Sequence, residues 1–144
     1  MGEALEFVAL LTTGLFTGAA AYISFVEHPA RMSCGTLLAA TEFVPSYRRA
    51  AVMQASLAAL ATLAGAGAYL AGSSVGWLLG ALLIGAVIPF TLFVIFPTNK
   101  RLLDANLDKN SAEARMLLEK WGRLHAVRTA LSAAAVLLFL TRSL

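Results

Sequence analysis

The chain alternates long apolar runs with short polar segments, and this pattern predicts membrane-spanning helices. No Asp, Glu, Lys or Arg occurs from Phe7 to Val26, nor from Ala50 to Asn99. A helix rises about 1.5 Å per residue, so about twenty apolar residues cross the ~30 Å hydrocarbon core of a bilayer. We expect four spans, at roughly residues 5–26, 50–71, 77–96 and 124–141.

These spans predict an all-α fold, a four-helix transmembrane bundle that forms one domain over residues 1–144. The polar stretch Ser111–Lys120 alternates charged and apolar residues at helical spacing, which is typical of an amphipathic helix. We therefore expect a short amphipathic helix in the loop between spans three and four. Residues Leu37–Phe43 predict a second short helix, lying at the membrane interface after span one.

Proline and glycine predict local features within the spans. Pro29 lacks a backbone N–H, so span one is expected to stop or kink there, and Pro89 predicts a kink in span three. Gly14 and Gly18 are four residues apart on one helix face, the spacing at which small residues allow close helix packing in membranes.

The two halves of the chain show a weak internal repeat. Each half reads as a span, a proline-containing exit (Pro29 or Pro97), a basic loop, an aromatic residue and a second span. The segments Tyr47–Gln54 and Trp121–Arg128 have the same spacing of aromatic, basic and polar residues. The repeat predicts two hairpins that run in the same direction across the membrane.

Composition and charge agree with a membrane protein. The chain is 59% hydrophobic and 13% charged, whereas a soluble domain is about 45–50% apolar and about 25% charged. The net charge of +3 does not indicate nucleic-acid binding, because the basic residues lie beside predicted spans. The lipid bilayer is the partner that we expect. The single cysteine, Cys34, excludes an internal disulfide and a Cys-x-x-Cys metal or redox site.

The distribution of lysine and arginine predicts the orientation. Basic residues gather in two loops, residues 27–49 and 97–123, whereas the N-terminal tail and the turn at residues 72–76 have none. By the positive-inside rule, both loops are expected to be cytoplasmic and both termini to lie on the opposite side. The loop residues are Arg31, Arg48, Arg49, Lys100, Arg101, Lys109, Arg115, Lys120 and Arg123.

Unusual polar and aromatic residues stand at the cytoplasmic ends of the spans. On the last helix, Trp121, His125, Arg128 and Ser132 form one continuous stripe. The helix ends of a bundle converge, so we expect a substrate site at this end. The candidates for catalysis are His125, Arg128, Asn99 and Trp121, and those for substrate binding are His28, Arg31, Tyr47 and Gln54.

Each candidate also has a purely structural interpretation. Arg31 matches a topology anchor that contacts lipid headgroups, and Tyr47 and Trp121 match interfacial aromatic residues. Asn99 is suited to cap the end of span three. The same applies to three others: His28 as a helix cap, Gln54 as a bridge between helices and Arg128 as a side chain that snorkels to the surface.

Three segments resemble the anthrone oxygenase family of small four-span membrane proteins. They are Glu27–Arg31, the Pro97-Thr98-Asn99 exit with Leu102, and the entrance in which Trp121, His125 and Arg128 are spaced by four and three. The resemblance extends over nearly the whole chain in the same order. It implies oxidation of an apolar aromatic anthrone to an anthraquinone by molecular oxygen, with no cofactor and no metal or flavin.

The residues fit such chemistry. An anthrone has a C–H group that its carbonyl acidifies by conjugation, so a base can generate a carbanion that reduces oxygen directly. His125 is the candidate base. Arg128 is suited to stabilise the enolate and the peroxide, Asn99 to orient the peroxide, and Trp121 to stack on the flat substrate.

Two other classes of function remain open from the sequence. His28 and His125 are expected near the same membrane face, where they are candidates for the axial ligands of a haem or for a quinone site. A non-enzymatic accessory protein, in which the polar cluster only specifies the bundle, is the other alternative.

Overall fold

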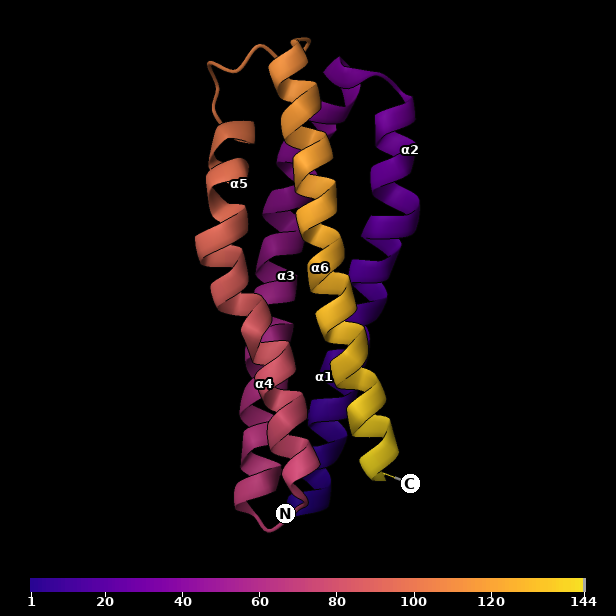
Figure 1. Cartoon of the computed structure of the whole chain (residues 1–144), viewed down its shortest axis with the longest axis vertical. Helices are drawn as coiled ribbons and strands as arrows, with labels where there is room; N and C mark the ends of the chain where they lie inside the picture. The colour runs from indigo at the N-terminus through magenta and orange to yellow at the C-terminus, as the bar shows by residue number, and fades with distance from the viewer. Residues whose placement is uncertain (144) are drawn as a thin grey trace.

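The structure, a computed structural model, describes residues 1–143, and within this range the only regular elements are helices. Four long helical rods run alternately up and down (Figure 1). The first and third rods are each interrupted by one turn of π-helix, labelled η1 and η2. The elements are α1 (Gly2–Tyr22), η1 (Ile23–Glu27), α2 (His28–Ser33), α3 (Thr36–Leu70), α4 (Val75–Phe90), η2 (Thr91–Ile95), α5 (Phe96–Leu102) and α6 (Ala112–Ser143).

All four rods are long and apolar enough to cross a membrane, which confirms the predicted all-α, four-span architecture. They cover Gly2–Ser33, Thr36–Leu70, Val75–Leu102 and Ala112–Ser143. Large apolar side chains are exposed along the outside, as a lipid-facing surface requires; Phe25, Leu70 and Phe93 are 76%, 82% and 79% exposed. The rods overlap the predicted spans and extend beyond them toward the two longer loops.

The separate amphipathic helix expected at Ser111–Lys120 is not confirmed. Its residues form the first turns of α6, which continues without a break into the apolar run. Leu37–Phe43 likewise belongs to α3 and not to an independent interfacial helix. The extensions persist because their inner faces are buried in one core cluster, to which Phe43 and Leu118 both belong.

The prolines near the loops do not end their helices. Pro29 and Pro97 each lie in the first turn of the helix that follows a π-helical turn. The residue just before each proline donates its N–H to the carbonyl five residues earlier, His28 to Ile23 and Phe96 to Thr91. The wider turn carries the rod past the missing proline N–H, so the stop or kink expected at Pro29 takes the form of a π-bulge.

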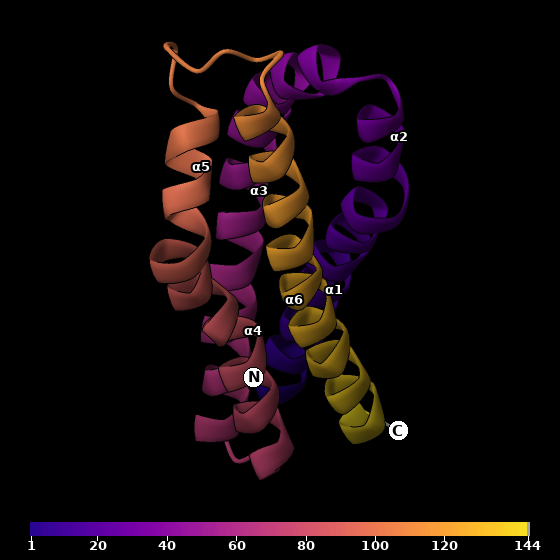
Figure 2. The same ribbon diagram turned by 45° about the horizontal axis from the view of Figure 1, so that its top comes forward.

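The two hairpins run in the same direction, as the internal repeat predicts. The rods from α1 and α4 both rise toward the end that carries the longer loops, and both termini lie at the opposite end (Figures 1 and 2). The two π-helical turns occupy corresponding places, each ending two residues before its proline. This match strengthens the repeat beyond what the sequence spacing alone indicated.

The half of the bundle that holds the termini is tightly packed. Trp77 and Phe139 stack with ring centroids 4.8 Å apart. Gly80 lies directly under the Phe139 ring, where a Cβ atom would collide with it. The expected packing role of Gly14 and Gly18 is wrong within residues 1–143, because no atom of another helix lies within 4 Å of where their Cβ atoms would be. The outward orientation of α1 at these positions leaves them on the surface.

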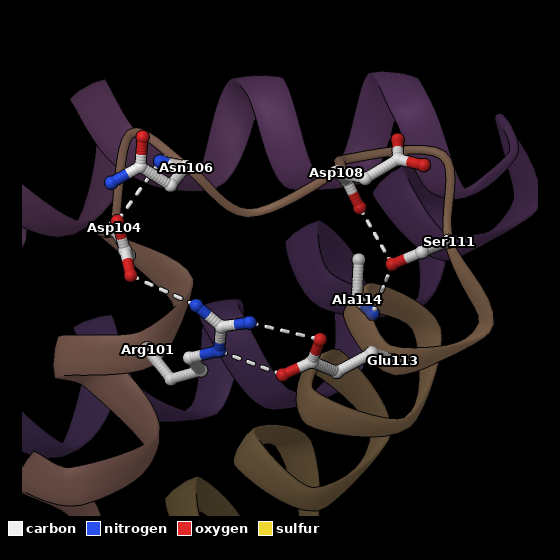
Figure 3. A network of polar contacts seen from close by, with 7 residues as sticks. All are labelled: Arg101, Asp104, Asn106, Asp108, Ser111, Glu113 and Ala114. Carbon is white, nitrogen blue, oxygen red and sulfur yellow. Dashed lines mark hydrogen bonds and ion pairs between the residues drawn. The ribbon is translucent and has the colours of Figure 1, made fainter.

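An ion-paired loop at the other end connects α5 to α6 (Figure 3). Arg101 donates to both oxygens of Glu113 and pairs with Asp104 at 2.8 Å, so it joins the end of α5 to the start of α6. The hydroxyl of Ser111 accepts the N–H of Ala114 at 3.1 Å and so caps α6. These contacts fix the upper ends of the rods around the interior described next.

Candidate functional site

A cavity of about 250 Å³ lies inside the half of the bundle that carries the two longer loops. Its wall is mostly apolar, with a few polar groups that come mainly from α3 and α6, as in many small-molecule sites. Six of the eight predicted site residues line it: Arg31, Tyr47, Gln54, Trp121, His125 and Arg128.

His125 is 1% exposed to solvent and lines the cavity from α6. Its ring stacks on Trp121, one turn earlier, with centroids 4.8 Å apart. The Nδ1 atom lies 3.1 Å from the hydroxyl of Ser24, which η1 presents from the first rod. One edge of the imidazole is therefore bound to the protein, and Nε2 makes no hydrogen bond within residues 1–143.

Arg128 and Gln54 form the polar centre of the cavity. The Arg128 Nη2 atom donates to Gln54 Oε1 at 2.6 Å, and the guanidinium lies over the ring of Phe16 at 5.4 Å. Two of their donors, Arg128 Nε and Gln54 Nε2, are buried without a hydrogen-bond partner within residues 1–143. In that range Arg128 forms no ion pair with a carboxylate. The pair thus places a positive charge at the cavity wall, with two donors beside it that make no hydrogen bond.

Asn99 lies one layer behind the cavity wall. It is 1% exposed, and its Nδ2 atom donates to the hydroxyl of Tyr47 at 3.0 Å. Tyr47 also stacks on Phe43, with ring centroids 5.5 Å apart. Tyr47 lines the cavity and Asn99 does not. The structure therefore places Asn99 as a support for Tyr47.

Arg31 faces the interior, not the lipid headgroups. It is 6% exposed, bonds to Glu27 one turn earlier and pairs with Glu42 at 2.9 Å. Its guanidinium also lies 5.9 Å from the ring centroids of both Phe43 and Trp121. The interpretation of Arg31 as a surface anchor is wrong: its charge is neutralised by two carboxylates, and the side chain helps to hold Trp121.

His28 does not line the cavity. Its ring lies 5.2 Å from the Trp121 ring, on which it is tilted by 53°, and it fills the space beside Gly122. Trp121 therefore contacts both His28 and His125, so the indole is packed against the two imidazoles that a bis-histidine haem would need. Within residues 1–143, no three His, Cys, Asp or Glu side chains lie together at a spacing suited to a metal ion.

The sequence interpretation missed five polar residues of the site: Ser24, Glu27, Ser46, Thr91 and Thr129. Thr129 follows His125 by one helical turn, so its position on the stripe was available from the sequence. Ser24 gave no such signal, because the π-helical turn shifts its direction relative to a regular helix. Ser46 donates to Glu27 at 2.7 Å, a contact between α3 and η1 that depends on how the rods pack.

One side of the cavity reaches the outer surface of the bundle. Its lining includes three side chains on the third rod, Ile88 of α4, Leu92 of η2 and Phe96 of α5, which are 36%, 57% and 49% exposed. Ala55 of α3, also exposed, lies on the facing rod. All of them are apolar, so this side connects the cavity to the surface that four membrane-spanning rods would present to lipid.

The protein family described as anthrone oxygenase matches residues 43–138, which include Gln54, Trp121, His125 and Arg128. No curated protein and no solved structure matches the chain with significance. Because the match covers well over half of the chain and agrees with the four-rod fold and its polar stripe, this protein belongs to the anthrone oxygenase family.

Proposed function

We propose that the protein is a membrane-embedded oxygenase that oxidises an apolar, anthrone-like aromatic substrate with molecular oxygen and without a cofactor. The observation that carries the proposal is the pairing of an unpartnered cation with a histidine in one apolar cavity. Arg128 and Gln54 each hold a donor without a partner, and His125 lines the same wall. A substrate that becomes an anion during the reaction satisfies all of these groups at once.

His125 acts in this proposal as the general base. Its Nε2 atom removes the acidic proton that lies opposite the carbonyl of the anthrone, which leaves an enolate delocalised over the rings. The base needs a fixed orientation, and the stacking on Trp121 together with the Ser24 contact provides it. The indole of Trp121 also offers an aromatic face to a flat substrate.

Arg128 and Gln54 stabilise the negative charge. Their free donors are fixed before the reaction in an apolar surrounding, where hydrogen bonds to an anion are stronger than in water. The enolate passes an electron to oxygen, the two radicals combine at the former C–H carbon, and the peroxide loses water to leave a second carbonyl. One anthrone and one O₂ thus give one anthraquinone and one water.

The location of the cavity suits a substrate that dissolves in lipid. The exposed apolar wall formed by Ile88, Leu92 and Phe96 offers a route from the bilayer to the interior. A planar polycycle is poorly soluble in water and concentrates in a membrane, so a lateral route avoids an aqueous step. We place the two longer loops, residues 27–49 and 97–123, in the cytoplasm on the strength of their basic residues.

The roles of the remaining candidates follow from their contacts. Tyr47 supplies a hydroxyl at the cavity wall, oriented by Asn99 at 3.0 Å. Arg31 and His28 act through Trp121, which both of them contact. Both support the indole face that the substrate meets, and Arg31 also forms part of the cavity wall. The proposed chemistry therefore depends on four side chains: Gln54, Trp121, His125 and Arg128.

Oxygen consumption by the purified protein in lipid nanodiscs tests the proposal. With an anthrone as substrate, we expect oxygen uptake and anthraquinone formation in equal amounts, and rates at least about 100-fold lower for His125→Ala and Arg128→Ala. Arg123→Ala is the matched control, because Arg123 lies on the same helix but is exposed. Equal rates for all four proteins, or no uptake by the wild type, would overturn the proposal.

A further inference from the structure

One imidazole and two hydroxyl groups form a continuous hydrogen-bond chain that ends at the backbone of α1. The Nδ1 atom of His125 lies 3.1 Å from Ser24 Oγ, and Ser24 Oγ lies 2.8 Å from Thr129 Oγ1. Thr129 Oγ1 in turn lies 3.2 Å from the carbonyl oxygen of Ala20 and 3.3 Å from that of His125. His125 and Thr129 are 1% and 8% exposed, and Ser24 between them is half-buried.

The carbonyl groups at one end of this hydrogen-bond chain fix the direction in which its members donate. A carbonyl oxygen can only accept, so the Thr129 hydroxyl donates to the carbonyls beside it. Thr129 Oγ1 then accepts from Ser24, whose single proton is thereby used. Ser24 Oγ has only acceptor capacity left for His125, so the proton must be on Nδ1. The reverse direction would turn the hydroxyl lone pairs of Thr129 toward two carbonyl oxygens, which is unfavourable in a buried site.

We propose that Ser24 and Thr129 are positioning residues that hold His125 in the tautomer with its proton on Nδ1 and a free lone pair on Nε2. The lone pair is what a general base requires, so the chain prepares His125 for proton removal. That catalytic consequence rests on the proposed function, whereas the tautomer itself does not.

The two hydroxyls reach His125 by different means. Thr129 lies one turn after His125 on α6, so regular helix geometry brings it close. Ser24 lies in η1, where the wider turn presents its hydroxyl toward α6. The π-helical turn therefore has a use besides carrying the rod past Pro29: it brings the middle link of the chain to the imidazole.

Nitrogen-15 NMR of the labelled full chain in nanodiscs measures the tautomer directly, because protonated and unprotonated ring nitrogens resonate in separate regions. The chain has two histidines, so a His28→Gln variant completes the assignment. We expect His125 to carry its proton on Nδ1 in the wild type. In Thr129→Val, Ser24 loses its acceptor and donates to the imidazole instead, so the proton moves to Nε2.

Three variants separate this role from a structural one. Thr129→Ser keeps the hydroxyl and should retain the wild-type spectrum. Thr13→Val removes a buried hydroxyl that bonds only to its own helix, at Ala9, and should also leave the spectrum unchanged. Thr129→Val should lower kcat for anthrone oxidation about 100-fold, with KM within about twofold. Ser24→Ala should give a mixture of both tautomers.

The outcomes distinguish this inference from the proposed function. A wild-type His125 protonated on Nε2 or on both nitrogens would overturn the inference, and so would an unchanged spectrum in Thr129→Val. If the spectra change as expected but the wild type does not oxidise an anthrone, the proposed function fails and the positioning role stands. A fall in kcat without a change of tautomer would assign Thr129 a structural role and overturn the inference.

Discussion

The two halves of the bundle differ in the hydrogen-bond partners of their buried polar side chains. In the half that holds the termini, buried threonines bond within their own helix, as Thr13 does with the Ala9 carbonyl at 2.6 Å. In the half that carries the longer loops, polar side chains bond across rods, as Gln54 does with Arg128 at 2.6 Å and Tyr47 with Asn99 at 3.0 Å. The first half, here called the closed half, is packed around stacked rings, and the second, the open half, contains the cavity.

The difference shows that packing and chemistry are divided along the length of one bundle. Helices in a membrane gain little from the hydrophobic effect, so the closed half depends on close contact, such as Gly80 against Phe139. The open half gives up close contact and retains donors without partners, at Arg128 and Gln54. Such donors are costly in an apolar surrounding, and their retention points to a ligand that uses them.

The largest expected effect comes from removing the polar pair of the open half. Gln54→Leu combined with Arg128→Leu should lower anthrone oxidation about 10²- to 10³-fold, because the cation and the amide that stabilise the enolate are both gone. Thermal unfolding in detergent should occur at the same temperature or higher, because the two unpartnered donors are gone. Gln54→Leu alone should be less stable than the double variant. A double variant that keeps its activity would contradict the assignment of the chemistry to the polar pair of the open half.

In the closed half, Gly80→Ala should reduce stability without touching the chemistry. The added methyl group would meet the Phe139 ring, and such overpacking costs about 1–3 kcal/mol. The measurement is thermal unfolding together with the activity per folded molecule, which should stay constant. Gly14→Ala is the control, since its methyl group would meet no atom within 4 Å. Equal unfolding temperatures for both variants would contradict the tight packing.

A substitution that fills the cavity should impair the activity and leave the stability nearly unchanged, the reverse of what we expect for Gly80→Ala. Ala51 lines the cavity, and Ala51→Leu occupies space that the substrate needs. We expect KM to rise about tenfold, as for the loss of one good apolar contact, while the stability changes by less than about 0.5 kcal/mol. Val52→Leu enlarges the neighbouring side chain, which is 71% exposed, and should change neither. A large loss of stability in Ala51→Leu would mean that the cavity is already filled by its own side chains.

The smallest effect is expected outside the membrane, in the loop before α6. The pKa of Asp104 is lowered, because its carboxylate accepts the backbone N–H of Asn106 and also pairs with Arg101. A lowered pKa contributes stability above the ordinary carboxyl range, near pH 4, and this contribution is lost as the pH falls through the folded-state value.

Thermal unfolding measured from neutral pH down to about pH 3 tests this contribution. Asp104→Asn should unfold at a slightly lower temperature at neutral pH, and the difference from the wild type should shrink in acid. Asp108→Asn removes a carboxylate from the same loop that has no arginine partner within residues 1–143, and serves as the control. A difference that grows as the pH falls would contradict the assigned sign.

Much of the candidate site follows from the sequence because helical spacing puts Trp121, His125 and Arg128 on one side of α6. The structure brings these three and Gln54 to one cavity. The sequence does not separate Asn99, which supports Tyr47 from behind, from the residues that line the wall. The distinction depends on how far one rod is rotated relative to the next, and no pattern within a single helix records that angle.

By itself, the sequence determined that four helices cross the membrane and which end of the bundle holds the polar groups, because charge-free runs and their borders are local properties. Only the tertiary structure decided which faces turn inward. It placed Gly14 outside, Arg31 inside and Ser24 against His125. The physical reason is that lipid is as apolar as the core, so in a membrane protein hydrophobic periodicity does not distinguish the buried face from the exposed one.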